Sequence, residues 1–285
     1  MELKKTDRKG PLCLLMASVF WSLGGVCIKF IPWSAMSIIL LRAVFAIGVF
    51  AIYRKSFRIK LTKGNILAAV CQSGTTIMYV FANQKTTAAA AVLLQFTAPV
   101  FILLMQLALY KKKPKPAEIL AVVMTIAGML LFFGDALGRS GMIGNILAIC
   151  SGLSFAGVFV FNKRKDVEPE QSTMLGFYIN AIIAAPFMLL NNTLTPDPRA
   201  WILVSLLGIV QVGLAYLVFA IGIKKTPALL ACLITALEPI LNPLWVALAT
   251  PERPGRFAIA GGIIIVVTIV SYNIYEEVKN NGKIG

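Results

Sequence analysis

Long apolar runs follow one another along the whole chain, separated by short polar segments. An apolar helix of about twenty residues crosses the hydrocarbon core of a membrane, which is about 30 Å thick. The segments between the runs are rich in Pro, Gly and Lys, which is typical of turns between helices. The pattern predicts ten membrane-spanning helices, over residues 11–30, 34–53, 64–83, 88–109, 117–134, 142–161, 172–190, 200–222, 228–249 and 256–275.

A short motif occurs twice in the chain, 140 residues apart. Residues 85–88 (Lys-Thr-Thr-Ala) resemble residues 225–228 (Lys-Thr-Pro-Ala), and the same offset pairs Pro99 with Pro239. We therefore expect two repeats of five helices each, 1–137 and 138–285. Because five is odd, the second repeat must enter the membrane from the opposite side. The predicted fold is an all-α membrane protein in which two inverted five-helix repeats surround a central cavity, as in many secondary transporters.

The composition supports a membrane protein and excludes several kinds of chemistry. Hydrophobic residues make up 58% of the chain and charged residues 14%, and the mean hydropathy is +0.82. A soluble domain carries about 25% charged residues. The absence of His excludes Ser-His-Asp triads and His-ligated zinc. Since phosphate-binding glycine loops are also missing, we expect no cofactor, no metal and no enzymatic activity.

The basic residues are distributed very unevenly between the two sides of the predicted bundle. With the N-terminus in the cytoplasm, 20 of the 27 Lys and Arg residues fall in cytoplasmic segments and 5 in outer ones. This asymmetry predicts a multi-pass protein of the cell membrane with both termini in the cytoplasm. We therefore attribute the net charge of +15 to basic residues that set the topology and contact anionic headgroups of the lipid bilayer. Nucleic acid is not an expected partner, because no contiguous basic face interleaved with aromatics is present.

Glu238 is the only acidic residue well inside a predicted span. An ionisable residue at this depth is costly and usually faces a cavity or a partner. On a helix, Thr235, Glu238, Asn242 and Trp245 share one face. We expect this face to bind a substrate amine or a coupling proton. The alternative is a structural Glu that ties its helix to Arg42 or to a backbone carbonyl.

Other polar and aromatic positions extend the candidate site. The third span carries a polar stripe that includes Gln72 and Tyr79. At the repeat offset of 140 residues, Gln95 occupies the position equivalent to Thr235. We expect these residues to line the cavity together with Gln211, although interhelical hydrogen bonding is an alternative. Tyr216, five residues further on, should point away from Gln211 on an α-helix. Trp21 and Phe155 are equivalent at an offset of 134 and are candidate aromatic walls; plain core packing is the alternative.

Several short motifs, taken in order, resemble a known family. They are Phe20-Trp21-Ser22 with Lys29, Leu41-Arg42, Gln95-Phe96-Thr97-Ala98-Pro99, Leu237-Glu238-Pro239 and Glu252-Arg253-Pro254. The chain is similar in these motifs and in its two-half layout to the EamA family of the drug/metabolite transporter superfamily. The resemblance implies a ten-helix basket whose helices 1, 3, 4, 6, 8 and 9 line a central cavity. It also implies a transporter of amino acids or other small metabolites.

The function expected from the sequence is therefore secondary active transport of a small metabolite, an amino acid or amine-bearing compound. The resemblance implies export, with uptake as the alternative. Proton coupling and alternating access by rocking of the two halves complete the expected mechanism. A membrane-embedded enzyme and a non-transporting membrane scaffold are the alternatives. Intramembrane hydrolysis normally needs clustered acids, a metal or a Ser/base pair, whereas a scaffold has no need of polar stripes on several helices.

Overall fold

The computed structural model describes residues 9–23, 31–134, 141–191, 193–241, 255–280 and 282, and every regular element in these residues is helical. Eight helical stretches are long and apolar enough to cross a membrane. The two remaining predicted spans, 11–30 and 228–249, are represented by α1 (Lys9–Ser22) and by the shorter apolar stretch Ala228–Leu241. The protein is thus an all-helical, multi-pass membrane protein, and the count of ten spans stays a prediction.

The remaining elements follow the predicted runs closely. They are α3 (Ala35–Arg54), α4 (Lys63–Lys85), α5 (Ala88–Gln95), α6 (Ala98–Tyr110), α7 (Pro116–Phe133), α8 (Met142–Phe161), α9 (Pro169–Leu190), α10 (Pro198–Leu206), the π-helical segment η2 (Leu207–Leu214), α11 (Ala215–Lys225), α12 (Ala228–Thr235) and α14 (Arg256–Asn280). The starts have local causes. The hydroxyls of Ser34, Thr62 and Thr87 each accept a hydrogen bond from the first turn of the following helix.

The two halves change direction at equivalent residues. At the offset of 140, α4 and α11 end at Lys85 and Lys225, and α5 and α12 begin three residues later in each half. Both of these short helices then end at equivalent residues, Phe96 (ψ 14°) and Ala236 (ψ −7°). Each of these helix ends lies three residues before a proline, Pro99 or Pro239. A proline nitrogen cannot donate the backbone hydrogen bond to the preceding turn that would continue the helix. The predicted run 88–109 is therefore two helices, α5 and α6.

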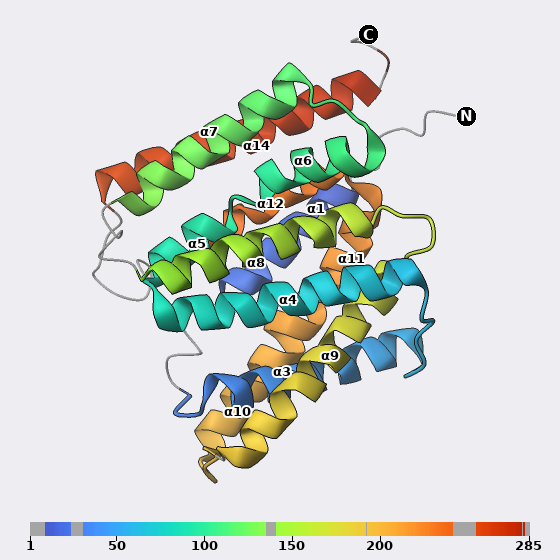
Figure 1. Cartoon of the computed structure of the whole chain (residues 1–285), viewed down its shortest axis with the longest axis vertical. Helices are drawn as coiled ribbons and strands as arrows, with labels where there is room; N and C mark the ends of the chain where they lie inside the picture. The colour runs from blue at the N-terminus through green and yellow to red at the C-terminus, as the bar shows by residue number, and fades with distance from the viewer. Residues whose placement is uncertain are drawn as a thin grey trace.

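The helices of one half pack mainly against those of the other. The most extensive contacts join α4 to α8, α7 to α14, α3 to α9 and α1 to α11. Most of these pairings occur twice, with the two halves exchanged. Helix α4 of the first half packs on α9 of the second, and the corresponding η2 of the second half packs on α3 of the first. In the same way, α5 packs on α8 and α12 packs on α1. Figure 1 shows α7 and α14 side by side at one edge of the bundle, and α3 with α9 and α10 at the opposite edge.

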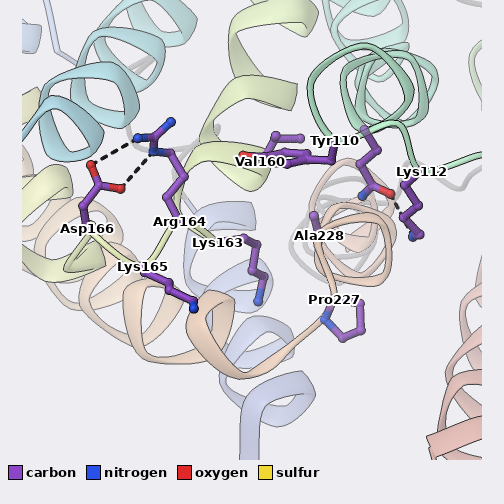
Figure 2. Close-up of a pocket in the computed structure, with 10 residues that line it drawn as sticks. Tyr110, Lys112, Val160, Lys163, Arg164, Lys165, Asp166, Pro227 and Ala228 are labelled. Atoms are coloured by element: carbon purple, nitrogen blue, oxygen red, sulfur yellow. Dashed lines mark hydrogen bonds and ion pairs between the residues drawn. The ribbon is translucent and has the colours of Figure 1, made fainter.

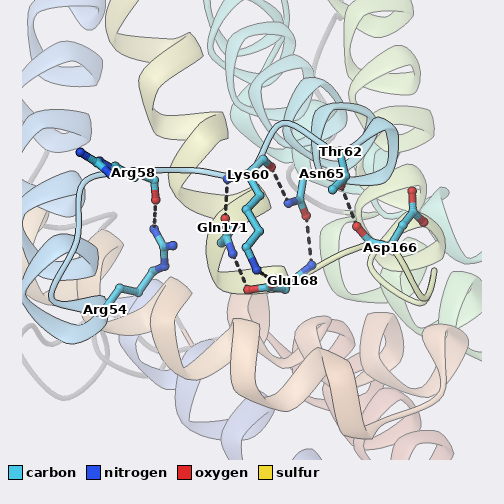
Figure 3. Close-up of polar contacts among 8 residues, drawn as sticks. All are labelled: Arg54, Arg58, Lys60, Thr62, Asn65, Asp166, Glu168 and Gln171. Carbon is cyan, nitrogen blue, oxygen red and sulfur yellow. Dashed lines mark hydrogen bonds and ion pairs between the residues drawn. The ribbon is translucent and has the colours of Figure 1, made fainter.

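Two of the links predicted to be cytoplasmic meet at one end of the bundle (Figure 3). There the α3–α4 link is hydrogen-bonded to the α8–α9 link: the Lys60 amide donates to Gln171 Oε1 (2.6 Å), Thr62 Oγ1 to the Asp166 carbonyl (2.7 Å) and the Glu168 amide to Asn65 Oδ1 (3.0 Å). These bonds join the two halves. Which end faces the cytoplasm stays a prediction from the charge asymmetry.

The carboxylates in the α8–α9 link are held ionised by their neighbours. Arg164 lies 2.9 Å from Asp166, and this hydrogen bond lowers the pKa of the Asp166 carboxyl. A hydrogen bond from Gln171 lowers the pKa of Glu168, which also lies 3.3 Å from Lys60 Nζ. The resulting stabilisation is present above the ordinary carboxyl pKa values, near 4, and is lost as the pH falls below them.

Links predicted to lie outside meet at the opposite end. Trp33 Nε1 donates to Thr195 Oγ1 (3.1 Å), and the ring of Trp33 lies 5.0 Å from that of Trp201. A Cβ placed on Gly141, just before α8, would lie 2.2 Å from the carbonyl oxygen of Lys85. Helices α1 and α8 occupy corresponding positions in their halves and begin at opposite ends of the bundle, since Gly10 lies against Thr226 at the basic end.

The outer pair α7 and α14 depends on two glycines at its crossing. A Cβ on Gly261 would lie 2.5 Å from the carbonyl oxygen of Gly128 and 2.6 Å from the amide nitrogen of Phe132. We expect Gly261→Leu to force the helices apart and to lower the stability by about 1–3 kcal/mol. Melting in detergent measures this. Gly48→Leu is the control, since a Cβ at Gly48 meets nothing within 4 Å; equal melting temperatures for the two variants would contradict the expectation.

Candidate functional site

A chain of aromatic rings runs through the core where the two halves meet. Phe155 contacts Phe159 (ring centroids 4.8 Å apart), Phe159 contacts Phe219 (5.7 Å), and Phe219 contacts Trp21 (5.2 Å). The ring of Tyr216 lies 4.8 Å from that of Trp21. The repeat equivalents Trp21 and Phe155 thus belong to one aromatic cluster, from α1 and α8. This placement fits both a substrate wall and core packing, so their role stays a proposal.

Arg42 and Gln211 connect α3 to η2 beside this cluster. Arg42 Nη2 donates to Gln211 Oε1 at 2.5 Å, and Gln211 Nε2 donates to the backbone oxygen of Trp21 at 3.2 Å. Two buried donors at the same place, Arg42 Nε and Trp21 Nε1, have no acceptor among the described residues. Buried donors without partners are costly. They are therefore the groups in this region best placed to receive an acceptor from a ligand or water.

Glu238 faces the same region from the second half. It lies two residues beyond the turn at Ala236, in the helical residues 237–241, and is partly exposed. Arg42 interacts electrostatically with Glu238, as do the hydroxyls of Tyr79 on α4 and Tyr216 on α11. No direct ion pair joins Arg42 to Glu238 among these side chains. The cluster of Trp21, Arg42, Tyr79, Gln211, Tyr216 and Glu238 therefore draws three residues from each half; we call it the central cluster.

The π-helical segment brings Gln211 and Tyr216 to the same place. Both contact Trp21, one through its backbone oxygen and the other through its ring. The sequence-based expectation that Tyr216 points away assumed α-helical spacing. In a π-helix the hydrogen bonds run from residue i to residue i+5, so side chains five apart lie near one another. The helix between Pro198 and Lys225 therefore departs from regular α geometry at the central cluster, as π segments at functional sites frequently do.

The other predicted site residues occupy neighbouring helix interfaces. Gln72 is buried and donates to the Thr173 carbonyl of α9 (3.4 Å), while Gln95 Nε2 donates to Ser151 Oγ on α8 (3.0 Å). Thr235 is fully buried and donates back to the Cys232 carbonyl (2.7 Å). None of the three has a hydrogen bond to Glu238. Their assignment to one cavity with Glu238 stays a prediction, while interhelical bonding describes the observed contacts.

Two predicted site residues, Asn242 and Trp245, lie outside the described residues. Two members of the central cluster, Arg42 and Tyr216, were not predicted as site residues. The sequence predicts Arg42 only as a structural partner of Glu238, and α-helical spacing points Tyr216 away from Gln211. Among the described residues no group of three or more Cys, Asp or Glu side chains is placed to hold a metal ion.

Relatives of the chain are transporters of similar length. The match to the Bacillus subtilis transporter YwfM has 28% identity over 183 residues, 62% of each chain. An Archaeoglobus fulgidus transporter is 25% identical, over 82% of this chain and 84% of its own. The aromatic amino acid exporter YddG of Ancylobacter novellus is 25% identical, over 67% of this chain and 69% of its own. A crystal structure with 18% identity superposes with a TM-score of 0.79, over 94% of this chain and 98% of its own, which shows the shared fold.

The family assignment follows from both halves of the chain. The model of the EamA-like transporter family matches residues 8–134 and again residues 142–274, once in each half. This is a family of transporters and not of enzymes. With eight candidate spans and two matched halves, the chain is a multi-pass membrane transporter that belongs to the EamA-like transporter family.

Proposed function

We propose that the chain is a secondary active transporter that exports a small metabolite, an amino acid or amine-bearing compound, by alternating access, with proton coupling through Glu238. The central cluster carries this proposal, because it combines an intramembrane acid, a guanidinium and aromatic rings from both halves. Intramembrane ionisable residues mark substrate and proton pathways. The reciprocal packing of the halves supports an inverted repeat about a midplane site, the arrangement that alternating access uses.

Each group of the central cluster has a role in this proposal. Glu238 binds the substrate amine or a proton. The unpartnered donors of Arg42 and Trp21 receive the substrate carboxylate. The aromatic chain around Trp21 accepts an apolar or aromatic side chain, and the relative named an aromatic amino acid exporter makes aromatic amino acids the first substrates to examine.

The test is flux in proteoliposomes that contain the purified full-length protein. Labelled aromatic and aliphatic amino acids and their decarboxylated amines are supplied with and without a pH gradient. Uptake or counterflow above protein-free liposomes, increased by the gradient, supports the proposal. No flux across this panel from correctly folded protein would favour a non-transporting scaffold instead.

The unpartnered donor of Trp21 gives a sharper expectation. Trp21→Phe keeps an aromatic ring and removes a buried N–H that lacks an acceptor, so the melting temperature should not fall. If this N–H contacts the substrate carboxylate, the KM should rise about tenfold or more, as for the loss of one charge-assisted hydrogen bond. Flux and detergent melting measure both effects.

Trp33→Phe is the matched control, because its indole N–H is already bonded to Thr195 at the end of the bundle. That variant should lower the melting temperature and leave the KM unchanged. A normal KM in a well-folded Trp21→Phe variant would remove Trp21 Nε1 from the substrate contacts.

A further inference from the structure

A cavity lies at the basic end of the bundle, away from the central cluster. Its volume is about 610 Å³, within the range of small-ligand sites. It lies between the end of α6, the α8–α9 link and the start of α12, and Figure 2 shows its lining. Tyr110, Val160, Pro227 and Ala228 form apolar walls, and Lys112, Lys163, Arg164, Lys165 and Asp166 form the charged ones.

Two of these cations are already paired. Arg164 lies 2.9 Å from Asp166, and Lys112 lies 2.8 Å from Glu118 and 2.9 Å from Gln106 Oε1. Lys163 and Lys165 have no carboxylate partner among the described residues. In Figure 2 the Lys163 side chain lies between the Arg164–Asp166 pair and Ala228. The cavity thus holds two cations whose charge is not compensated.

Lys163 is constrained in a way that ordinary surface lysines are not. The residue as a whole is exposed, but its ammonium donates a hydrogen bond to the Ile223 carbonyl at the end of α11. The surrounding protein removes water from the ammonium and lowers the pKa of Lys163 to about 8. An ammonium held this way retains further N–H donors and gains from a bound anion.

The apolar walls restrict the kind of anion. Val160 and Ala228 belong to the main hydrophobic core, so the cavity extends from the basic rim to the apolar interior of the bundle. A small inorganic ion would leave these walls in water, whereas an anion with an apolar body would cover them. Basic pockets between helices at the headgroup level are also suited to anionic lipid.

We propose that this cavity binds an anionic amphiphile, with its carboxylate or phosphate on Lys163 and Lys165 and its apolar body against Tyr110, Val160 and Ala228. The ligand is either a small apolar carboxylate or an anionic lipid, which share this chemistry. The site is separate from the central cluster and does not depend on the proposed transport function.

The experiment measures binding to the full-length protein in a neutral detergent. One arm compares phenylacetate with its uncharged isostere phenylacetamide, and the other compares phosphatidylglycerol with phosphatidylcholine. The double variant Lys163→Gln/Lys165→Gln is compared with Lys55→Gln/Lys113→Gln, two lysines at the same end that do not line the cavity. Gln at position 163 retains a donor for the Ile223 carbonyl, so the variant should fold.

We expect the anionic probe of at least one arm to bind more tightly than its neutral counterpart. Its affinity should fall about tenfold or more in the cavity variant, as for a lost charged contact, and stay unchanged in the control. An effect on phenylacetate identifies the small carboxylate as the source, and an effect on phosphatidylglycerol identifies lipid.

The proposal is overturned if neither anion binds, if the neutral probes bind equally well, or if the two double variants lose the same affinity. Binding is also measured in Glu238→Gln protein. Retained binding there, with pH-driven flux abolished, separates this site from the transport site. Absent flux in every form, with intact binding, would reject the proposed function and leave this inference standing.

Discussion

Glu238→Gln is expected to abolish flux driven by a pH gradient, reducing it below about a tenth of the wild-type rate, while the protein still inserts and folds. Gln preserves the shape and one acceptor oxygen of Glu, but it neither takes up nor releases a proton. An acid inside an apolar chain is costly to bury, and its usual justification is a proton or substrate pathway. If Glu238 exchanges a proton for a substrate amine, removing the carboxyl uncouples transport from the gradient.

The measurement is pH-driven uptake per folded molecule, together with the melting temperature in detergent. Passive exchange of substrate without a gradient should persist in part. Glu170→Gln, the same chemical change in the first turn of α9, is the control and should retain full coupling. Normal pH-driven uptake by a well-folded Glu238→Gln variant would exclude proton coupling at this residue and leave it a packing or weak binding role.

Arg42→Gln is expected to destabilise the protein by about 1–3 kcal/mol, because it removes the charged hydrogen bond to Gln211 and the cation that interacts with Glu238. Arg42 donates to Gln211 and is the cation that interacts with Glu238. Without it, the Glu238 charge is left inside the bundle without compensation and Gln211 loses its donor. Thermal and denaturant unfolding in detergent measure the loss, and flux per folded molecule should fall as well.

The double variant Arg42→Gln/Glu238→Gln distinguishes this explanation from a simple packing defect. It removes both charges, so it should be more stable than Arg42→Gln alone. Arg54→Gln is a control at the end of α3, where the guanidinium lies at the surface and bonds to the Arg58 carbonyl. If the single and double variants unfold at the same temperature, Arg42 acts without electrostatic coupling to Glu238.

Much of the fold could be predicted because hydropathy and repetition are properties of the residues themselves. The apolar runs located the described helices. The motif at 85–88 and 225–228 predicted the repeat, and in each half one helix ends and the next begins at this motif. Pro99 and Pro239 belong to the same repeat, yet the break before Pro99 was not expected from an apolar run of this length. The backbone bonds that a proline removes interrupt a helix without interrupting its hydropathy.

The central cluster could be predicted only in part, since periodicity fails where the helix is irregular. Glu238, Trp21, Tyr79 and Gln211 were found from charge, chemistry and repeat position. Tyr216 was not, because its spacing from Gln211 was converted to an angle with α-helical geometry.

A signal for the π segment was nevertheless present in two glycines. Gly208 and Gly213 lie five apart, and a Cβ on them would meet Phe45 and Val49, one turn apart on α3. Five-residue spacing of close-packed glycines on one face is what a π-helix produces.

The interlocked packing of the two halves has a consequence for biogenesis. As the ribosome delivers the first five helices, the surfaces that α1, α3, α4 and α7 will bury have no partners, because these partners belong to α8, α9, α11 and α14. These surfaces must therefore be covered by lipid or by an insertion factor until translation of the second half is nearly finished. A nascent chain halted after residue 137 should accordingly be open to degradation, and two separately synthesised halves should rescue one another when produced in the same cell.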